Sequence, residues 1–111
     1  MTNISPLDAL GDPTRRKLFE YLRLGPSSVT ELISIVPISQ PAVSQHLRVL
    51  RESGLVDVRT DAQRRVYRLR TEPLEEVDAW LEPYRKRWMD RFDRLERHLE
   101  TLQQTSAKET P

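Results

Sequence analysis

The sequence has no cysteine, only three glycines in 111 residues, and no apolar run near the roughly 18 residues of a membrane-spanning helix. The absence of cysteine excludes disulfide bonds, thiol catalysis and cysteine metal ligands. So few glycines disfavour a glycine-rich loop that binds phosphate groups. The short, polar N-terminus does not resemble a signal peptide. We therefore expect a protein of the cytoplasm with no membrane partner and no cofactor.

The net charge of +1 hides an uneven distribution along the chain. Positions 1–39 hold four acidic and four basic residues, and so have no net charge. Positions 40–70 hold seven arginines and three acidic residues, whereas positions 71–111 hold seven basic and ten acidic residues. The middle of the chain is therefore positive, and a local positive field steers polyanions whatever the total charge is.

Capping signals divide the first part of the chain into short helices. Positions 5–6 and 12–13 each place a capping side chain before a proline, which is the arrangement that starts helices. Gly25 is expected to end the second helix. Ser28 and Glu31 have the spacing of a capping box, which predicts a third helix that ends by the proline at position 37.

The stretch from Ser39 to Gly54 predicts a further helix with two unlike faces. Val43, Leu47 and Leu50 form an apolar stripe, and the opposite face is polar. Short helices joined by a short turn, the second with polar side chains on its first turns, are typical of a helix-turn-helix. The second helix of that motif lies in the major groove of DNA.

After this helix the sequence alternates with a period of two. Residues 55–70 read as two strands around a turn at 61–64, which predicts a β-hairpin. Arg59, Arg64 and Arg65 lie near its tip. A hairpin in this place is a wing, and a basic tip suits contact with phosphates or the minor groove.

The chain is expected to be helical again from Pro73. Apolar residues recur three and four positions apart from Leu74 to Leu102, a pattern that needs a partner helix. Pro83 predicts a kink or a restart within this helix. The fold class is therefore mainly α with a small β-hairpin, a dimeric winged helix-turn-helix. We expect a DNA-binding domain at 1–72, a dimerisation helix at 73–103 and a disordered tail at 104–111.

Three segments together resemble the ArsR/SmtB family of bacterial winged-helix repressors. They are "LGDPTRRKLFEYL", the long segment that contains "SQPAVSQHLRVLRESGLV", and "WLEPYRKRWMDRFDRLERHLE". The resemblance covers roughly residues 7–102. It implies a homodimer built from the first and last helices that binds an operator with inverted repeats. Many members of this family are metal sensors.

The metal-binding positions of those sensors are not matched here. Where they have Cys-Val-Cys before Glu-Leu, this chain has Ser-Val-Thr at 28–30, and hydroxyls are poor ligands for soft metals. The second family site uses paired histidines on the last helix, which here has His98 alone, near Asp93 and Glu100. We therefore predict no metal site, and the effector stays unknown.

The predicted DNA contacts lie on the outer face of the helix after Ser39 and at the hairpin tip. They are Ser39, Gln40, Pro41, Ser44, Gln45, His46, Arg48, Arg51, Arg64 and Arg65. Ser44 and Gln45 are expected at base edges, because glutamine suits adenine, whereas the arginines are expected at phosphates. A solvated helix face is the alternative. His46 lies about 60° from the apolar stripe, and a half-buried histidine bonded within its own domain is the favoured interpretation.

The predicted dimer interface joins apolar side chains from both ends of the chain. They are Leu7, Leu10, Trp80, Leu81, Tyr84, Trp88, Phe92, Leu95 and Leu99. The aromatic members could instead line an effector pocket, although a dimer core is the commoner use of aromatic residues at helical spacing.

The expected function is sequence-specific binding of double-stranded DNA by a transcriptional regulator, a repressor that covers promoter DNA as a homodimer. The alternative is a winged-helix adaptor or anti-regulator that binds proteins. RNA is less favoured, because a helix cannot read the deep groove of A-form RNA. Neither histidine belongs to a catalytic triad or a metal motif, so an enzyme is not expected.

Overall fold

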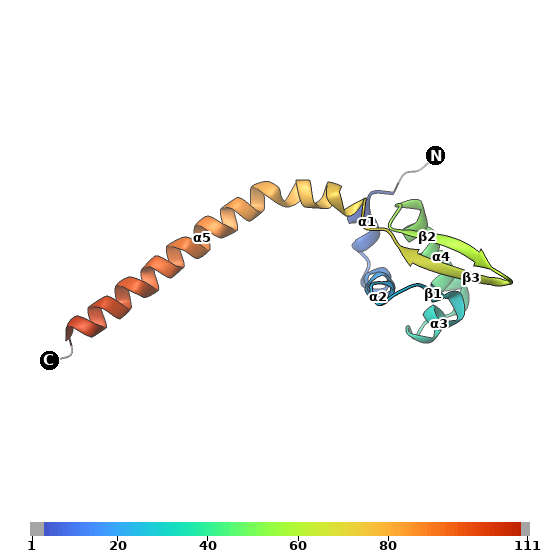
Figure 1. The fold of residues 1–111 in the computed structure, drawn as a ribbon, viewed down its shortest axis with the longest axis horizontal. Coiled ribbons are helices and arrows are strands. Elements are labelled where there is room, and N and C mark those ends of the chain that lie inside the picture. Colours follow the sequence, from blue (N-terminus) through green and yellow to red (C-terminus); the bar gives the residue numbers. More distant parts are fainter. Residues whose placement is uncertain (1–3, 110–111) are drawn as a thin grey trace. The chain divides into compact units, whose positions relative to one another are not determined.

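The computed structural model describes the backbone of residues 4–109 and the side chains of residues 4–105. The elements in chain order are α1 (Pro6–Leu10), α2 (Pro13–Leu22), β1 (Ser27–Ser28), α3 (Val29–Ser34), α4 (Gln40–Glu52), β2 (Val56–Asp61), β3 (Arg64–Leu69) and α5 (Leu74–Glu109) (Figure 1). The chain divides into two units, Met1–Val77 and Asp78–Pro111. The predicted fold class, mainly α with a small hairpin in a winged helix-turn-helix, is confirmed.

Side-chain caps start the helices where the sequence predicts them. The Ser5 hydroxyl accepts the backbone N–H of Asp8 at 3.1 Å, and the Ser39 hydroxyl accepts that of Ala42 at 3.3 Å. The Asp12 carboxylate accepts two N–H groups in the first turn of α2, at 2.8 and 3.0 Å. Each such cap stabilises its helix by about 1 kcal/mol, because it satisfies backbone donors that have no partner in the helix.

α3 begins after its predicted cap but is shorter than expected. The Ser28 hydroxyl accepts the N–H of Glu31 at 3.3 Å. The Glu31 carboxylate accepts a hydrogen bond from the Ser27 hydroxyl at 2.9 Å. Of the two hydrogen bonds of a capping box, the structure therefore has the one from the Glu31 N–H to Ser28. The helix ends at Ser34, whose hydroxyl donates to the Glu31 carbonyl and so offers an alternative to the helical bond. The predicted end by Pro37 is therefore about one turn too late.

The sheet has three strands in the order β1-β3-β2, one more than the predicted hairpin. β2 and β3 pair in antiparallel register around a two-residue turn at 62–63, so the hairpin itself is confirmed. Ser27 pairs with Tyr67, and Ser28 pairs with Val66. β1 therefore joins the start of α3 to the wing.

The core of the first unit lies among α1, α2, α3, α4 and the sheet. Its buried apolar side chains are Ala9, Leu18, Phe19, Leu22, Leu32, Val36, Val43, Leu47, Leu50, Leu55, Val56 and Tyr67. The predicted stripe of α4 is fully inside this core. Leu74 also packs against this core, and the first unit extends to Val77, whereas the predicted boundary lies at residue 72.

α5 continues through Pro83 as one helix, so the predicted restart does not occur. A proline removes one backbone donor and crowds the preceding turn. Here Arg85 Nη2 donates to the carbonyl oxygen of Asp78 at 2.7 Å, and the same guanidinium pairs with the carboxylates of Asp78 and Glu82. The side chain of Arg85 thus bonds backbone and carboxylate oxygens in the turn before the proline.

α5 also continues past residue 103, where the predicted dimerisation helix ended. The backbone of residues 104–109, within the segment predicted to be a disordered tail, is helical, and residues 110–111 lie outside the described residues. The hydroxyls of Thr101 and Thr105 donate to carbonyls one turn earlier. Positions 103–109 contain neither glycine nor proline, so the helix can continue there without an apolar stripe. Within the described residues, no helix is long and apolar enough to cross a lipid bilayer.

Candidate nucleic-acid interface

One groove of the first unit lies between α4 and the wing. Six of the ten predicted DNA contacts line it: Gln40, Ser44, Arg48, Arg51, Arg64 and Arg65. The other four are Ser39, Pro41, Gln45 and His46, of which the first three are exposed and His46 is half-buried. The fold therefore brings together side chains from α4, which is the second helix of the helix-turn-helix and the recognition helix of the prediction, and from a hairpin that begins after that helix ends.

Further residues of the groove were not predicted from the sequence. Thr30 lines it from the first turn of α3, and Gln63 lines it from the turn of the wing. Tyr67 lies buried at its base, with the Arg65 guanidinium 5.8 Å from the ring centroid. The position of Gln63 beside the basic tip was a usable signal. No signal in the sequence could have placed Thr30 in the groove, because its position there depends on how α3 packs against the wing.

The groove is strongly positive. Four arginines line it, and Glu52 is the acidic residue among its described lining residues. Arg48 Nε donates to Glu52 Oε1 at 3.0 Å. Arg51, Arg64 and Arg65 form no ion pair within the described part of the chain. Three guanidinium groups are thus available to a polyanion, which is the charge pattern of a phosphate-binding surface.

A bidentate ion pair fixes the register of the wing. Asp57 and Arg68 face each other across β2 and β3, with Nε to Oδ1 at 3.2 Å and Nη2 to Oδ2 at 3.1 Å. The hydrogen bond from Arg68 holds the pKa of the Asp57 carboxyl below its ordinary value, and the same bond raises the pKa of Arg68. A paired guanidinium and carboxylate directly opposite each other favour this strand alignment over a shifted one.

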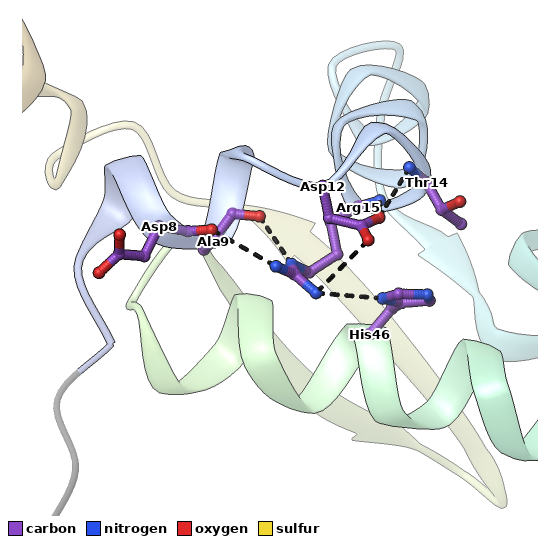
Figure 2. Close-up of polar contacts among 6 residues, drawn as sticks. All are labelled: Asp8, Ala9, Asp12, Thr14, Arg15 and His46. Atoms are coloured by element: carbon purple, nitrogen blue, oxygen red, sulfur yellow. Dashed lines mark hydrogen bonds and ion pairs between the residues drawn. The ribbon is translucent and has the colours of Figure 1, made fainter.

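α1, α2 and α4 meet at the guanidinium of Arg15 (Figure 2). Its Nε donates to the Ala9 carbonyl at 2.7 Å, its Nη2 to the Asp8 carbonyl at 3.4 Å, and its Nη1 lies 3.4 Å from Nδ1 of His46. Asp12 Oδ2 lies 4.0 Å from Nη1. The backbone N–H of Arg15 is the main cause that lowers the pKa of Asp12. His46 is half-buried and contacts its own domain, in line with the interpretation favoured above.

The residues of the predicted dimer interface differ in exposure. Leu10 is half-buried against the core, Leu81 is half-buried, and Leu7 is 43% exposed. The α5 members are between 45% and 62% exposed: Trp80, Tyr84, Trp88, Phe92, Leu95 and Leu99. Their rings follow one another along the helix, with centroids 5.1 Å apart for Trp80 and Tyr84 and 6.4 Å apart for Tyr84 and Trp88. Among the described residues, no group of three or more potential ligands is placed to hold a metal ion.

Comparison with known proteins gives one consistent result. The family described as "Bacterial regulatory protein, arsR family" matches residues 12–58. The HTH-type transcriptional regulator Rv2034 of Mycobacterium tuberculosis is 52% identical over 61 residues, which are 55% of this chain and 57% of that protein. The transcriptional repressor SdpR of Bacillus subtilis is 30% identical over 73 residues, which are 66% of this chain and 81% of SdpR. The match with the mycobacterial regulator thus spans little more than half of its length.

Solved structures support the same relationship. A crystal structure described as a possible transcriptional regulator for arsenical resistance is 39% identical, with a TM-score of 0.68. The superposition covers 86% of this chain and 96% of that one. The likeness therefore extends well beyond the segment that the family description matches.

Proposed function

The chain belongs to the ArsR family of bacterial regulatory proteins, and from that premise we propose that it is a DNA-binding transcriptional regulator. It binds an operator of inverted repeats as a homodimer and represses transcription by covering promoter DNA. Such a function places it in the cytoplasm, with the bacterial chromosome. No catalytic activity forms part of this proposal.

The groove between α4 and the wing is the observation that carries the proposal. Ser44 comes from the first turns of the recognition helix, which are the turns that reach base edges in a helix-turn-helix. Arg64 and Arg65 come from the wing and suit the phosphates beside the site. One surface therefore combines side chains suited to base edges with side chains suited to phosphates.

The exposed apolar face of α5 supports a homodimer. Its large side chains, from Trp80 to Leu102, form a stripe that is long for a solvent-facing helix. A second copy of the same helix offers a surface of the same length and spacing across a two-fold axis. Two recognition helices related in this way read half-sites about 10–10.5 bp apart, or a multiple of that distance.

Selection of random DNA by the purified chain, followed by fluorescence anisotropy, tests the function. Gln45→Ala should weaken binding to the selected operator by about 1–3 kcal/mol and change binding to random DNA little. Arg65→Ala should weaken both and lower the salt slope by about one phosphate contact. Arg23→Ala is the matched control, because Arg23 is an exposed arginine paired with Glu20 outside the groove.

The outcomes separate the parts of the proposal. Equal losses on both DNAs for Gln45→Ala would contradict the base-reading role of that side chain. Failure to enrich any sequence, with random DNA also unbound, would contradict DNA binding and favour the protein-binding adaptor.

A further inference from the structure

We infer that Arg15 is a positioning residue that presents His46 to DNA as a neutral hydrogen-bond donor, an inference that rests on the proposed function. Arg15 lies on α2, outside the groove, and its guanidinium faces the ring of His46 on the recognition helix (Figure 2). The acceptor on DNA is a phosphate oxygen or an acceptor atom at a base edge.

The contact between the two side chains determines where the histidine carries its proton. A guanidinium group has only donors and stays charged at every pH that a folded protein meets. Nη1 of Arg15 lies 3.4 Å from Nδ1 of His46, so Nδ1 must accept this hydrogen bond. A neutral imidazole that accepts at Nδ1 has its proton on Nε2. His46 therefore offers an N–H on the edge of the ring that faces away from Arg15.

Arg15 is itself held in place from other directions. Its Nε donates to the Ala9 carbonyl at 2.7 Å and its Nη2 to the Asp8 carbonyl at 3.4 Å, at the end of α1. The Asp8 carbonyl also accepts the backbone N–H of Gly11 at 3.2 Å, whereas the Ala9 carbonyl lies in the last turn of α1 and is satisfied by Arg15. The carboxylate of Asp12 lies 4.0 Å from Nη1, and the side chain of Arg15 is only 19% exposed. The donor toward His46 is thus fixed before any ligand arrives.

The position of His46 gives this tautomer a use. His46 follows Ser44 and Gln45 on α4 and is half-buried, so part of the residue is accessible to a ligand. A ring whose proton is fixed on Nε2 needs no rearrangement to donate to DNA, and a preorganised donor binds better than a mobile one. The charged groups that face the ring are Arg15 and Asp12, both from α2; α1 contributes only backbone carbonyls here.

The first test observes the tautomer directly in the full chain without DNA. Nitrogen-15 NMR of the histidine rings should show His46 as the neutral Nε2–H form, and Arg15→Ala should convert it to a mixture of the two neutral forms. Arg16→Ala removes an exposed neighbour on the same helix and should leave the spectrum unchanged. His98, the second histidine of the chain, lies on α5 and serves as a reference in every spectrum. An Nδ1–H form of His46 in the unsubstituted protein would overturn the inference, whatever the fate of the proposed function.

The second test measures binding to the selected operator. Glutamine at position 46 keeps an amide donor near the place of Nε2–H, whereas asparagine ends short of it. His46→Gln should therefore bind within about twofold of the unsubstituted protein, and His46→Asn about tenfold more weakly. Arg15→Ala should also lose about tenfold, and adding it to His46→Asn should cost nothing further, because both changes remove one shared interaction.

Losses on operator and random DNA alike would identify a phosphate acceptor, and losses on the operator alone would identify a base. Full affinity of His46→Asn, or additive losses in the double variant, would refute the positioning role. The variants at position 46 leave Arg15 intact, so they test the inference even if Arg15→Ala does not fold.

Discussion

Replacing Glu52 with glutamine should tighten binding to DNA of any sequence. Glu52 is the acidic residue among the described residues that line the groove, and its Oε1 lies 3.0 Å from Nε of Arg48. While this pair persists, the carboxylate of Glu52 neutralises the Arg48 guanidinium from the same helix and also places a negative charge near the phosphates. Glutamine at position 52 has nearly the same shape as glutamate but removes both effects.

The size of the effect follows from counterion release. Arg48 would gain about one phosphate contact, which makes the slope of log affinity against log salt more negative by about 0.9. Affinity should then rise roughly eightfold at about 0.1 M salt and roughly threefold at about 0.3 M. The stability of the free protein should change by less than about 0.5 kcal/mol, because the Arg48 side chain is 70% exposed and exposed pairs contribute little.

Fluorescence anisotropy over a salt series, on the operator and on random DNA, measures these changes. Glu20→Gln is the matched control, because it removes one carboxylate from an exposed pair with Arg23 on α2, outside the groove. The control should leave the slope unchanged. A Glu52→Gln protein that binds more weakly with an unchanged slope would refute the reasoning and assign Glu52 to orienting Arg48 for a contact.

Three further outcomes test other parts of the structure. Asp57→Asn should destabilise the protein at about pH 7. Arg68 lowers the pKa of Asp57 in the folded protein, so the loss of stability should have its full size above the ordinary carboxyl pKa of 3.8 and should shrink as the pH falls below that value. Urea unfolding at a series of pH values measures this. A loss of stability that does not depend on pH would contradict the prediction. Ala62→Gly should raise the free energy of unfolding by about 1 kcal/mol, because Ala62 has a φ of +58°; unchanged urea unfolding would contradict this. Trp88→Ala should raise the dissociation constant of the homodimer at least about tenfold in sedimentation, and an unchanged constant would remove Trp88 from the interface.

Local signals predicted most of the first unit. Caps such as Ser39 act within one turn, and the alternation of residues 55–70 fixes a hairpin without reference to the rest of the chain. β1 could not be predicted in this way. It has two residues, and they become a strand only because Val66 and Tyr67, far along the chain, lie beside them.

The same distinction holds for the candidate site. Arg64 and Arg65 could be placed at the wing because their position depends on a local turn. The contact of Arg15 with His46 could not, because it joins residues 31 positions apart where three helices meet. In α5, the apolar stripe ends at Leu102, whereas the helix continues to Glu109. An apolar stripe indicates which face of a helix is buried, whereas the position of the helix end depends on the helix propensity of the residues there.

The short reach of β1 leaves the wing open to evolutionary change. β1 pairs only with Val66 and Tyr67, so the two outermost residue pairs of the hairpin have no third strand beside them. Descendants of this chain can insert or delete two cross-strand pairs at a time there and keep every side chain on its present face, whereas the insertion or deletion of a single pair would reverse the faces of the tip, because side chains alternate along a strand with a period of two. The length of the wing, and with it the stretch of flanking DNA that the protein covers, can therefore diverge while the core and the recognition helix keep their packing.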